Sequence, residues 1–223
     1  MSDLRLVVFD VDGTLVDSQA DILASMQAAF DSVDLSVPNR EDILGIVGLS
    51  LNVAMPRLAP QVGRDVHHAL EDAYKAAYMQ LRATQGAAKS SPLYPGAREA
   101  LDGLAARADT LLGVATGKSR RGLDKLLAGH GMQGVFVTEQ VADFHPSKPH
   151  PSMLHAALQE TGVPAEQAVM IGDTSYDMDM ARSAGYAAIG VSWGYHDRAA
   201  LAGADVVIDS FAALPTALEQ ILG

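Results

Sequence analysis

The 223-residue sequence contains no cysteine, which excludes disulfide bonds and thiolate chemistry. It has no run of about 18 apolar residues, so we expect no membrane-spanning helix, and its first residues, MSDLRLVVFD, do not follow the pattern of a secretory signal. Basic residues are few: 16 Lys and Arg face 27 Asp and Glu, for a formal net charge of −11, which argues against a nucleic-acid partner. We expect a cytoplasmic protein, a monomer or homodimer, with no nucleic-acid or membrane partner.

Two regions of the chain differ in their pattern. Apolar residues make up 48% of the sequence, enough for a folded core. Between residues 18 and 90 they recur at helical spacing, as in Ile22, Met26 and Phe30, with Ser18 as a plausible N-cap and no convincing strand. The turn-rich stretch GAAKSSPLYPG at 86–96 then predicts a hinge to a different region.

Strands alternate with helices in the rest of the chain, which predicts a parallel sheet covered on both sides. The predicted fold class is α/β: a Rossmann-like doubly wound parallel sheet core with an inserted all-helical cap domain. The core comprises residues 1–16 and 91–223, and the cap comprises residues 17–90. The predicted strands are 4–9, 110–116, 134–138, 168–173, 186–192 and 204–210, and the predicted helices of the core lie near 96–108, 119–129, 151–161 and 176–184.

Residues whose side chains could take part in catalysis or ligand binding follow four of these strands. In open parallel sheets, ligands bind beyond the carboxyl ends of the strands, so these residues should meet at one edge. Each taken alone has a simpler reading as a turn, cap or surface residue. The set is Asp10 and Asp12 after the first strand, Thr116, Gly117 and Lys118 after the second, Lys148 in the loop after the third, and Asp173 and Asp177 after the fourth.

The same motifs resemble a known family. FDVDGTLVDS, VATGKS, SKPHP and GDTSYDMDMARSAG occur in the order and approximate spacing of the haloacid dehalogenase superfamily. Within it, the chain looks like the phosphoglycolate phosphatase branch, whose helical cap follows the first motif directly, and SWGYH at 192–196 resembles a segment of that branch. The resemblance covers nearly the whole length and implies a phosphatase that acts on a small phosphorylated metabolite.

The residue types fit this chemistry. A carboxylate can attack phosphorus directly and form an acyl phosphate that water later hydrolyses, and Asp10, first after its strand, is the natural nucleophile. Asp12 can protonate the departing alkoxide and later take a proton from water. Thr116 and Gly117 can donate hydrogen bonds to phosphate oxygens, and Lys148 supplies positive charge.

Oxygen ligands from Asp10, Asp12 and Asp173 suit Mg²⁺. The resemblance implies that Asp12 contributes its main-chain carbonyl and that Asp177 supports the ligands or their waters. We therefore expect a Mg²⁺-dependent phosphatase that forms an aspartyl phosphate. The alternatives are a sugar-phosphate mutase of the same superfamily and a non-catalytic phospho-acceptor or signalling domain.

Other positions stay open at this stage. Lys118 is about equally a surface lysine or a substrate contact. Gly45 and Gly48 resemble the cap loop that faces the site, where Ser50, Asn52 and Arg57 could read the leaving group. That loop shows no clear pair of cations for a carboxylate-bearing substrate, and the lysines of the cap, Lys75 and Lys89, are predicted to lie away from it. The residues do not decide between phosphoglycolate and other phosphomonoesters.

Overall fold

A six-stranded parallel sheet forms the centre of the protein, which we describe from a computed structural model covering residues 4–223. The strand order is β3-β2-β1-β4-β5-β6, and every neighbouring pair is parallel. Winding reverses between β1 and β4, and open α/β sheets bind ligands at such a point. The strands are β1 (Arg5–Phe9), β2 (Thr110–Thr116), β3 (Thr138–Val141), β4 (Ala168–Gly172), β5 (Ala187–Val191) and β6 (Val206–Ile208).

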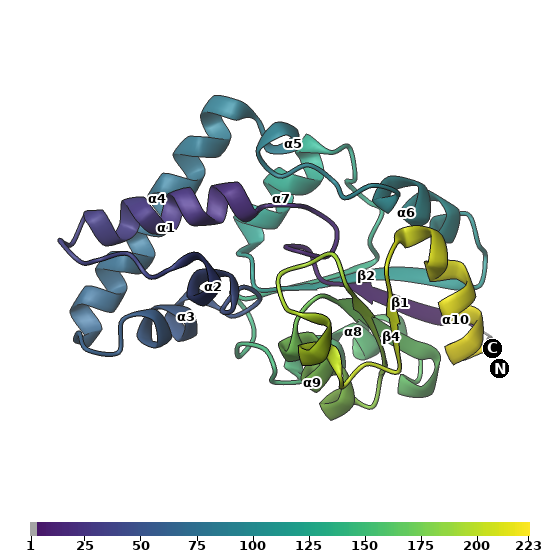
Figure 1. Cartoon of the computed structure of the whole chain (residues 1–223). Helices are drawn as coiled ribbons and strands as arrows, with labels where there is room; N and C mark the ends of the chain where they lie inside the picture. The colour runs from purple at the N-terminus through teal and green to yellow at the C-terminus, as the bar shows by residue number, and fades with distance from the viewer. Residues whose placement is uncertain (1–3) are drawn as a thin grey trace.

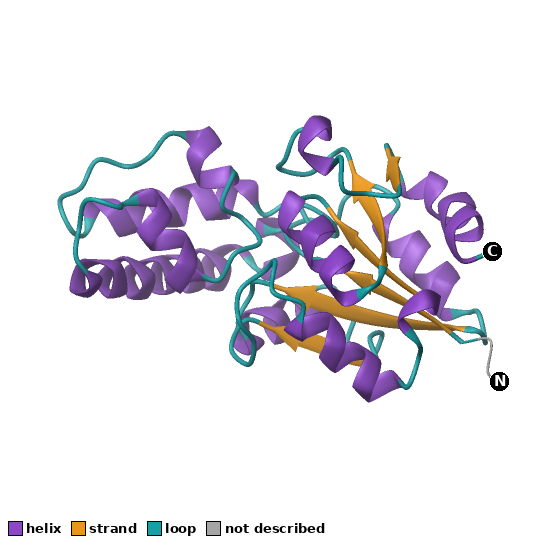
Figure 2. Cartoon of the chain, turned by 90° about the horizontal axis from the view of Figure 1, so that it is seen from below, coloured by secondary structure: helices purple, strands orange, loops and turns teal. Residues whose placement is uncertain are grey.

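Helices cover both faces of this sheet (Figure 2). Strand β1 shows the cause: Val7 and Phe9 belong to one buried apolar cluster and Leu6 and Val8 to another, because successive side chains of a strand point to opposite faces. Each such side chain contributes about 1.5–3 kcal/mol when buried. Residues of α6 (Ala97–Ala105), α7 (Arg120–Gly129) and α10 (Leu214–Leu222) join the first cluster, and residues of α8 (Ser152–Thr161) and α9 (Ser175–Ala184) join the second.

A block of helices follows β1 before the chain returns to the sheet, and we call this block the cap. Figure 1 shows its first four helices beside the sheet rather than over its faces. The cap has its own apolar core, which includes Met26, Phe30 and Leu70. Its helices are α1 (Gln19–Asp31), α2 (Arg40–Leu44), α3 (Leu51–Leu58), α4 (Arg64–Gln85) and α5 (Ala87–Ser90). The predicted fold class is confirmed, whereas the domain boundaries 1–16, 17–90 and 91–223 stay a prediction.

The two chain segments that join cap and core lie side by side. The backbone N–H of Tyr94 donates to the carbonyl of Leu15, and that of Asp17 donates to the carbonyl of Pro92, each at 2.9 Å. The predicted hinge at 86–96 therefore ends in a short segment paired with residues 15–17. This pairing fixes where the cap leaves the sheet edge.

The third strand lies further along the chain than predicted. We expected residues 134–138, but β3 spans Thr138–Val141. Gly134 adopts a positive φ of 76° within a turn, and Val137 is 57% exposed. The apolar run at 134–137 therefore belongs to a turn region and not to a strand. The less apolar segment TEQV pairs with β2 instead.

Three short 3₁₀ helices complete the described fold, at Ala165–Gln167, Arg198–Leu201 and Phe211–Ala213. Within residues 4–223, no helix combines the length and the hydrophobicity needed to cross a membrane.

Candidate active site

The predicted site residues meet at one edge of the sheet, beside the point where winding reverses. Asp10 follows β1, Asp173 follows β4, and Thr116 ends β2. Lys148 reaches the same edge from the loop between β3 and α8, and Asp177 comes from the first turn of α9. Separate segments thus converge because parallel strands all present their carboxyl ends on one side.

Lys148 is the centre of a buried ionic cluster. Its Nζ lies 2.7 Å from Oδ1 of Asp10 and 2.6 Å from Oδ1 of Asp177. Its side chain has no exposed surface, and those of its partners have 1% or less. Burial would lower the pKa of Lys148, but the two carboxylates outweigh burial and raise the pKa, so the ammonium stays charged.

Negative charge exceeds positive charge in this cluster. Carboxylate oxygens of Asp10, Asp173 and Asp177 lie within 4.8 Å of one another, and all three residues are buried beside the single Lys148. Burial and the nearby Asp177 raise the pKa of Asp10 to about 7 against the opposing pull of Lys148. Burial, Asp10 and Asp177 also raise the pKa of Asp173 well above its ordinary value. Such an excess is costly in the interior without a further cation.

Hydrogen bonds fix Asp173 in place. Thr14 Oγ1 donates to its Oδ1 at 2.9 Å, and the backbone N–H of Tyr195 donates to its Oδ2 at 2.8 Å. Gly13 makes room for the carboxylate: its φ is +84°, and a Cβ there would lie 2.1 Å from Oδ2 of Asp173. The turn after β1 therefore requires glycine at this position.

The cluster fits a divalent metal ion. Asp10 Oδ2 is buried and has no hydrogen-bond partner within residues 4–223, and the neighbouring Asp173 offers further carboxylate oxygens. Three carboxylates against one ammonium leave an excess of two negative charges, which a divalent ion would balance. Asp177 has both oxygens engaged: Oδ1 accepts from Lys148, and Oδ2 accepts from the N–H and hydroxyl of Thr174 in a capping box that begins α9.

The Asp12 carboxylate belongs to a second group that faces the cap. Its Oδ1 lies 2.8 Å from Nζ of Lys118 and accepts a hydrogen bond from the hydroxyl of Ser18. Burial would raise the pKa of Asp12, but Lys118 and Ser18 outweigh burial, so the pKa is lowered. Lys118 also donates to the hydroxyl of Tyr78 at 3.1 Å. The surface reading of Lys118 is wrong, since its side chain is only 8% exposed.

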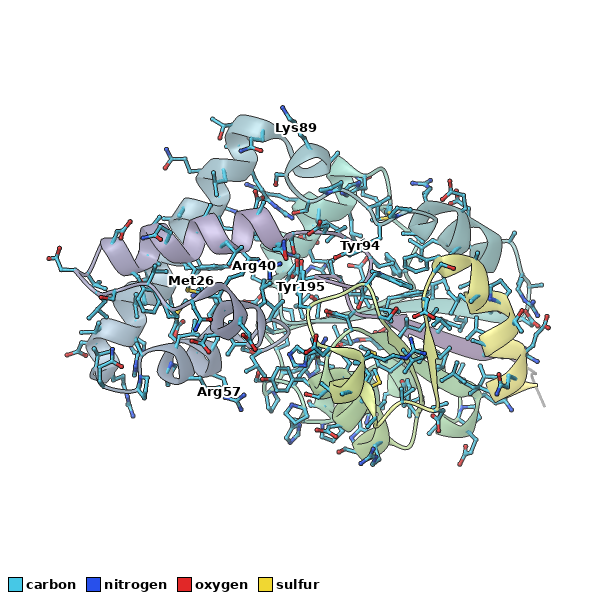
Figure 3. All side chains as sticks on the ribbon, in the orientation of Figure 1. Met26, Arg40, Arg57, Lys89, Tyr94 and Tyr195 are labelled. Carbon is cyan, nitrogen blue, oxygen red and sulfur yellow. The ribbon has the colours of Figure 1, made fainter. Side chains whose placement is uncertain are left out.

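The side chain of Ser18 bonds to this second group and not to the backbone of α1. Ser18 is the N-cap residue of α1, as predicted, but its side chain makes no capping hydrogen bond to that helix. The hydroxyl bonds Asp12 instead, and the hydroxyl of Tyr195 lies 3.1 Å from it. Figure 3 places Tyr195 at the junction of cap and core. The backbone N–H of Gln19, the first residue of α1, donates a hydrogen bond to Oδ1 of Asp17 at 3.2 Å.

The glycine loop of the cap packs onto the motif after β2. A Cβ at Gly117 would lie 2.7 Å from the carbonyl oxygen of Gly48 and 3.1 Å from that of Leu49. Only glycine at 117 allows this approach. Thr116 is buried, and its Oγ1 accepts from the N–H of Lys118 at 3.2 Å. The cap thus lies against the residues predicted to hold phosphate.

A cavity of about 320 Å³ extends from Asp12, Gly117 and Lys118 into the cap. The cap positions predicted to read the leaving group do not line it: Ser50, Asn52 and Arg57 are absent from its walls. Arg57 instead contacts the hydroxyl of Tyr176 at 3.1 Å, and Figure 3 shows it pointing away from the cap interior.

Cationic residues line the cavity, and they come from α4, α7 and the segment after β2 rather than from the glycine loop. Lys75 lines the same cavity as Gly48, and its side chain is 51% exposed in its pair with Glu71. Arg82 also lines the cavity and is buried, bonding the carbonyl of Gly122 and the hydroxyl of Ser91. Tyr74, Tyr78 and Arg82 follow one another at a spacing of four residues, so they lie on one face of α4. This spacing could have identified Arg82 as a cavity residue from the sequence.

Comparison with known proteins agrees with this geometry. The sequence model of the family described as haloacid dehalogenase-like hydrolase matches residues 7–191. The chain is 34% identical over 222 residues to "Probable phosphatase IndB" of Dickeya dadantii (strain 3937), covering 97% of this chain and 94% of the relative. It is 31% identical over 219 residues to a phosphoglycolate phosphatase of Agrobacterium fabrum, covering 97% and 93%.

Solved structures show the same fold. A crystal structure of a predicted phosphoglycolate phosphatase from Haemophilus somnus 129PT superposes with a TM-score of 0.84 at 26% identity, over 97% of this chain and 99% of that one. A β-phosphoglucomutase of Clostridium difficile reaches 0.82 at 18% identity, over 98% and 96%, a likeness of fold alone. The family match spans most of the sequence, including the motifs after β1, β2 and β4. The chain therefore belongs to the haloacid dehalogenase-like hydrolase family, and it is a hydrolase.

Proposed function

We propose that this hydrolase is a Mg²⁺-dependent phosphatase that cleaves a small phosphomonoester through an aspartyl phosphate. The observation that carries the proposal is the buried group of Asp10, Asp173, Asp177 and Lys148, whose excess negative charge lies beside the end of β1. The relatives named phosphatases support the same reaction.

Asp10 is the proposed nucleophile. A carboxylate oxygen attacks phosphorus while the bond from phosphorus to the leaving oxygen breaks, which leaves an acyl phosphate on Asp10. The hydrogen bond from Lys148 to Oδ1 orients the carboxylate. The same ammonium can stabilise charge on the phosphoryl oxygens, together with the hydroxyl of Thr116 and the N–H of Gly117.

Asp12 is the proposed general acid and base. It borders both the phosphoryl end of the site and the cavity that receives the leaving group. Its carboxyl would donate a proton to the departing alkoxide and later accept one from the water that hydrolyses the acyl phosphate. The ion pair with Lys118 favours the carboxylate, the form that this second step needs.

Asp10 and Asp173 would hold a Mg²⁺ ion, with the main-chain carbonyl of Asp12 as a further ligand and Asp177 in support. The bound ion would neutralise the charge between the nucleophile and the phosphoryl group. In its absence, burial and then the repulsion between the carboxylates raise the pKa of Asp10 and Asp173.

Steady-state hydrolysis of 4-nitrophenyl phosphate tests the proposal. We expect turnover that requires Mg²⁺ and is lost in Asp10→Asn, while Asp179→Asn, an exposed change of the same type on α9, keeps it. Mass spectrometry of a rapidly quenched reaction should place one phosphoryl group on Asp10. Full turnover by Asp10→Asn would exclude the mechanism, and transfer of phosphate between sugars without release would favour a mutase.

A further inference from the structure

The cavity between cap and core lies on the leaving-group side of the proposed reaction. It begins at Asp12 and extends into the cap, away from the buried carboxylates of Asp10 and Asp173, which do not line it. Its volume of about 320 Å³ falls at the lower end of the ~300–1,000 Å³ typical of small-molecule pockets. A two-carbon acid such as glycolate would leave most of this space unfilled.

The cap side of the cavity is apolar and aromatic. Met26 points from α1 towards the other cap helices (Figure 3), and Ala54 of α3 is fully buried. Tyr74 and Tyr78 lie one turn apart on α4, with ring centroids 5.9 Å apart and planes 24° from parallel. Surfaces of this kind bind flat, apolar groups by burial and stacking.

The other side of the cavity carries positive charge. Arg121 and Lys125 lie four residues apart on α7, about 6 Å along the helix axis. Arg82 faces them from α4, and its Nε is buried without a hydrogen-bond partner within residues 4–223. Within residues 4–223, Arg82, Arg121 and Lys125 form no ion pair with a carboxylate. Lys118, by contrast, is already paired with Asp12.

A cationic wall is unusual in a protein whose formal net charge is −11. Asp12 is the only acidic residue among the described residues that line the cavity, and Lys118 neutralises it. Basic side chains without acidic partners attract and orient an anionic group. Arg121 and Lys125 lie along α7 beyond Lys118, so an anionic group bound to them would lie away from the reacting phosphate.

We propose that the substrates are phosphomonoesters whose leaving group has a flat apolar body and a second anionic group at its far end. The inference rests on the proposed function and names the substrate class of the same site. Tyr74, Tyr78 and Met26 cover the body, and Arg121 and Lys125 bind the anion.

Four substrates separate the contributions of size and charge. Ethyl phosphate and 2-phosphoglycolate form the small pair, and benzyl phosphate and 4-carboxybenzyl phosphate form the aromatic pair. All four have an alkyl leaving oxygen, and within each pair the second member adds a carboxylate. We expect kcat/KM with Mg²⁺ to be highest for 4-carboxybenzyl phosphate, about tenfold above benzyl phosphate and at least tenfold above 2-phosphoglycolate.

A charge-matched pair of variants locates the anion site. In Arg121→Gln/Lys125→Gln, the preference for 4-carboxybenzyl over benzyl phosphate should fall from about tenfold to near one. The control, Arg64→Gln/Lys89→Gln, removes the same charge from positions that are exposed, as Arg121 and Lys125 also are, but that lie outside the cavity; Lys89 points outward in Figure 3. This control should keep the preference, which excludes a long-range effect of net charge.

The outcomes separate this inference from the function on which it rests. Hydrolysis of all four substrates with 2-phosphoglycolate preferred would overturn the substrate class and leave the phosphatase proposal standing. An equal fall in the preference for 4-carboxybenzyl over benzyl phosphate in both double variants would likewise overturn the substrate class and leave the phosphatase proposal standing. If 4-nitrophenyl phosphate is hydrolysed with Mg²⁺ but none of the four is, only the substrate class is overturned; no Mg²⁺-dependent hydrolysis of any of the five would overturn both proposals.

Discussion

Nζ of Lys118 lies 2.8 Å from Oδ1 of Asp12, and the two side chains are 8% and 14% exposed. The pair joins the segment after β2 to the segment after β1. It also lies at the boundary between the carboxylate cluster and the cavity in the cap. The acid proposed to serve the leaving group is thus held by a cation that the sequence left as either a surface lysine or a substrate contact.

Breaking this pair should destabilise the protein. Lys118→Met leaves the Asp12 carboxylate largely buried without its cation, and we expect a loss of about 3 kcal/mol in the free energy of unfolding. Lys75→Met is the control, because Lys75 is 51% exposed in its pair with Glu71 and should cost less than about 1 kcal/mol. Urea unfolding of Lys118→Met, Asp12→Asn and the double variant measures the coupling, and simple additivity would contradict it.

Replacing Asp12 should affect substrates according to their leaving groups. Asp12→Asn removes the proposed general acid, which typically contributes about 10²–10⁴-fold. The loss in kcat/KM should be of this size for ethyl phosphate and much smaller for 4-nitrophenyl phosphate, because nitrophenolate departs without a proton. Steady-state kinetics with both substrates provide the measurement. Equal losses for both would assign Asp12 another role.

Removal of the metal should be visible without an activity assay. Mg²⁺ at about 100 times its Kd should stabilise the folded protein by about 2.7 kcal/mol, because it offsets the repulsion among Asp10, Asp173 and Asp177. Thermal unfolding with Mg²⁺ and with EDTA measures the difference. Asp173→Asn should abolish the response to Mg²⁺, and Asp179→Asn should preserve it. An unchanged response in Asp173→Asn would place the metal elsewhere.

Gly13→Ala should displace Asp173. The added Cβ would lie 2.1 Å from Oδ2 of Asp173, at a φ of +84°, so both the carboxylate and the turn must shift. We expect loss of hydrolysis and of the stabilisation by Mg²⁺. Gly103→Ala is the control, since a Cβ there meets nothing within 4 Å and alanine stabilises a helix by roughly 0.5–1 kcal/mol relative to glycine. Normal hydrolysis by Gly13→Ala would show that the turn tolerates a side chain.

Much of the fold could be predicted because strands and helices have different apolar periods. Val7 and Phe9 alternate with Leu6 and Val8 between the two faces of the sheet, a pattern set by local geometry. The third strand shows the limit of this reasoning. The run GVFVT is apolar enough for a strand, yet pairing with β2 begins at Thr138, because register depends on the neighbouring strand and not on hydrophobicity alone.

The order of the amino acids is enough to show that acids, a hydroxyl and a lysine follow the strands, and parallel topology brings such residues to one edge. Their partners depend on the folded arrangement of the chain: Lys148 lies between Asp10 and Asp177, and Lys118 pairs with Asp12. Contacts between segments more than 100 residues apart, such as Lys148 with Asp10, follow from how the segments of the chain pack in three dimensions. No local pattern encodes them, and the same packing places basic side chains of α4 and α7 around one cavity.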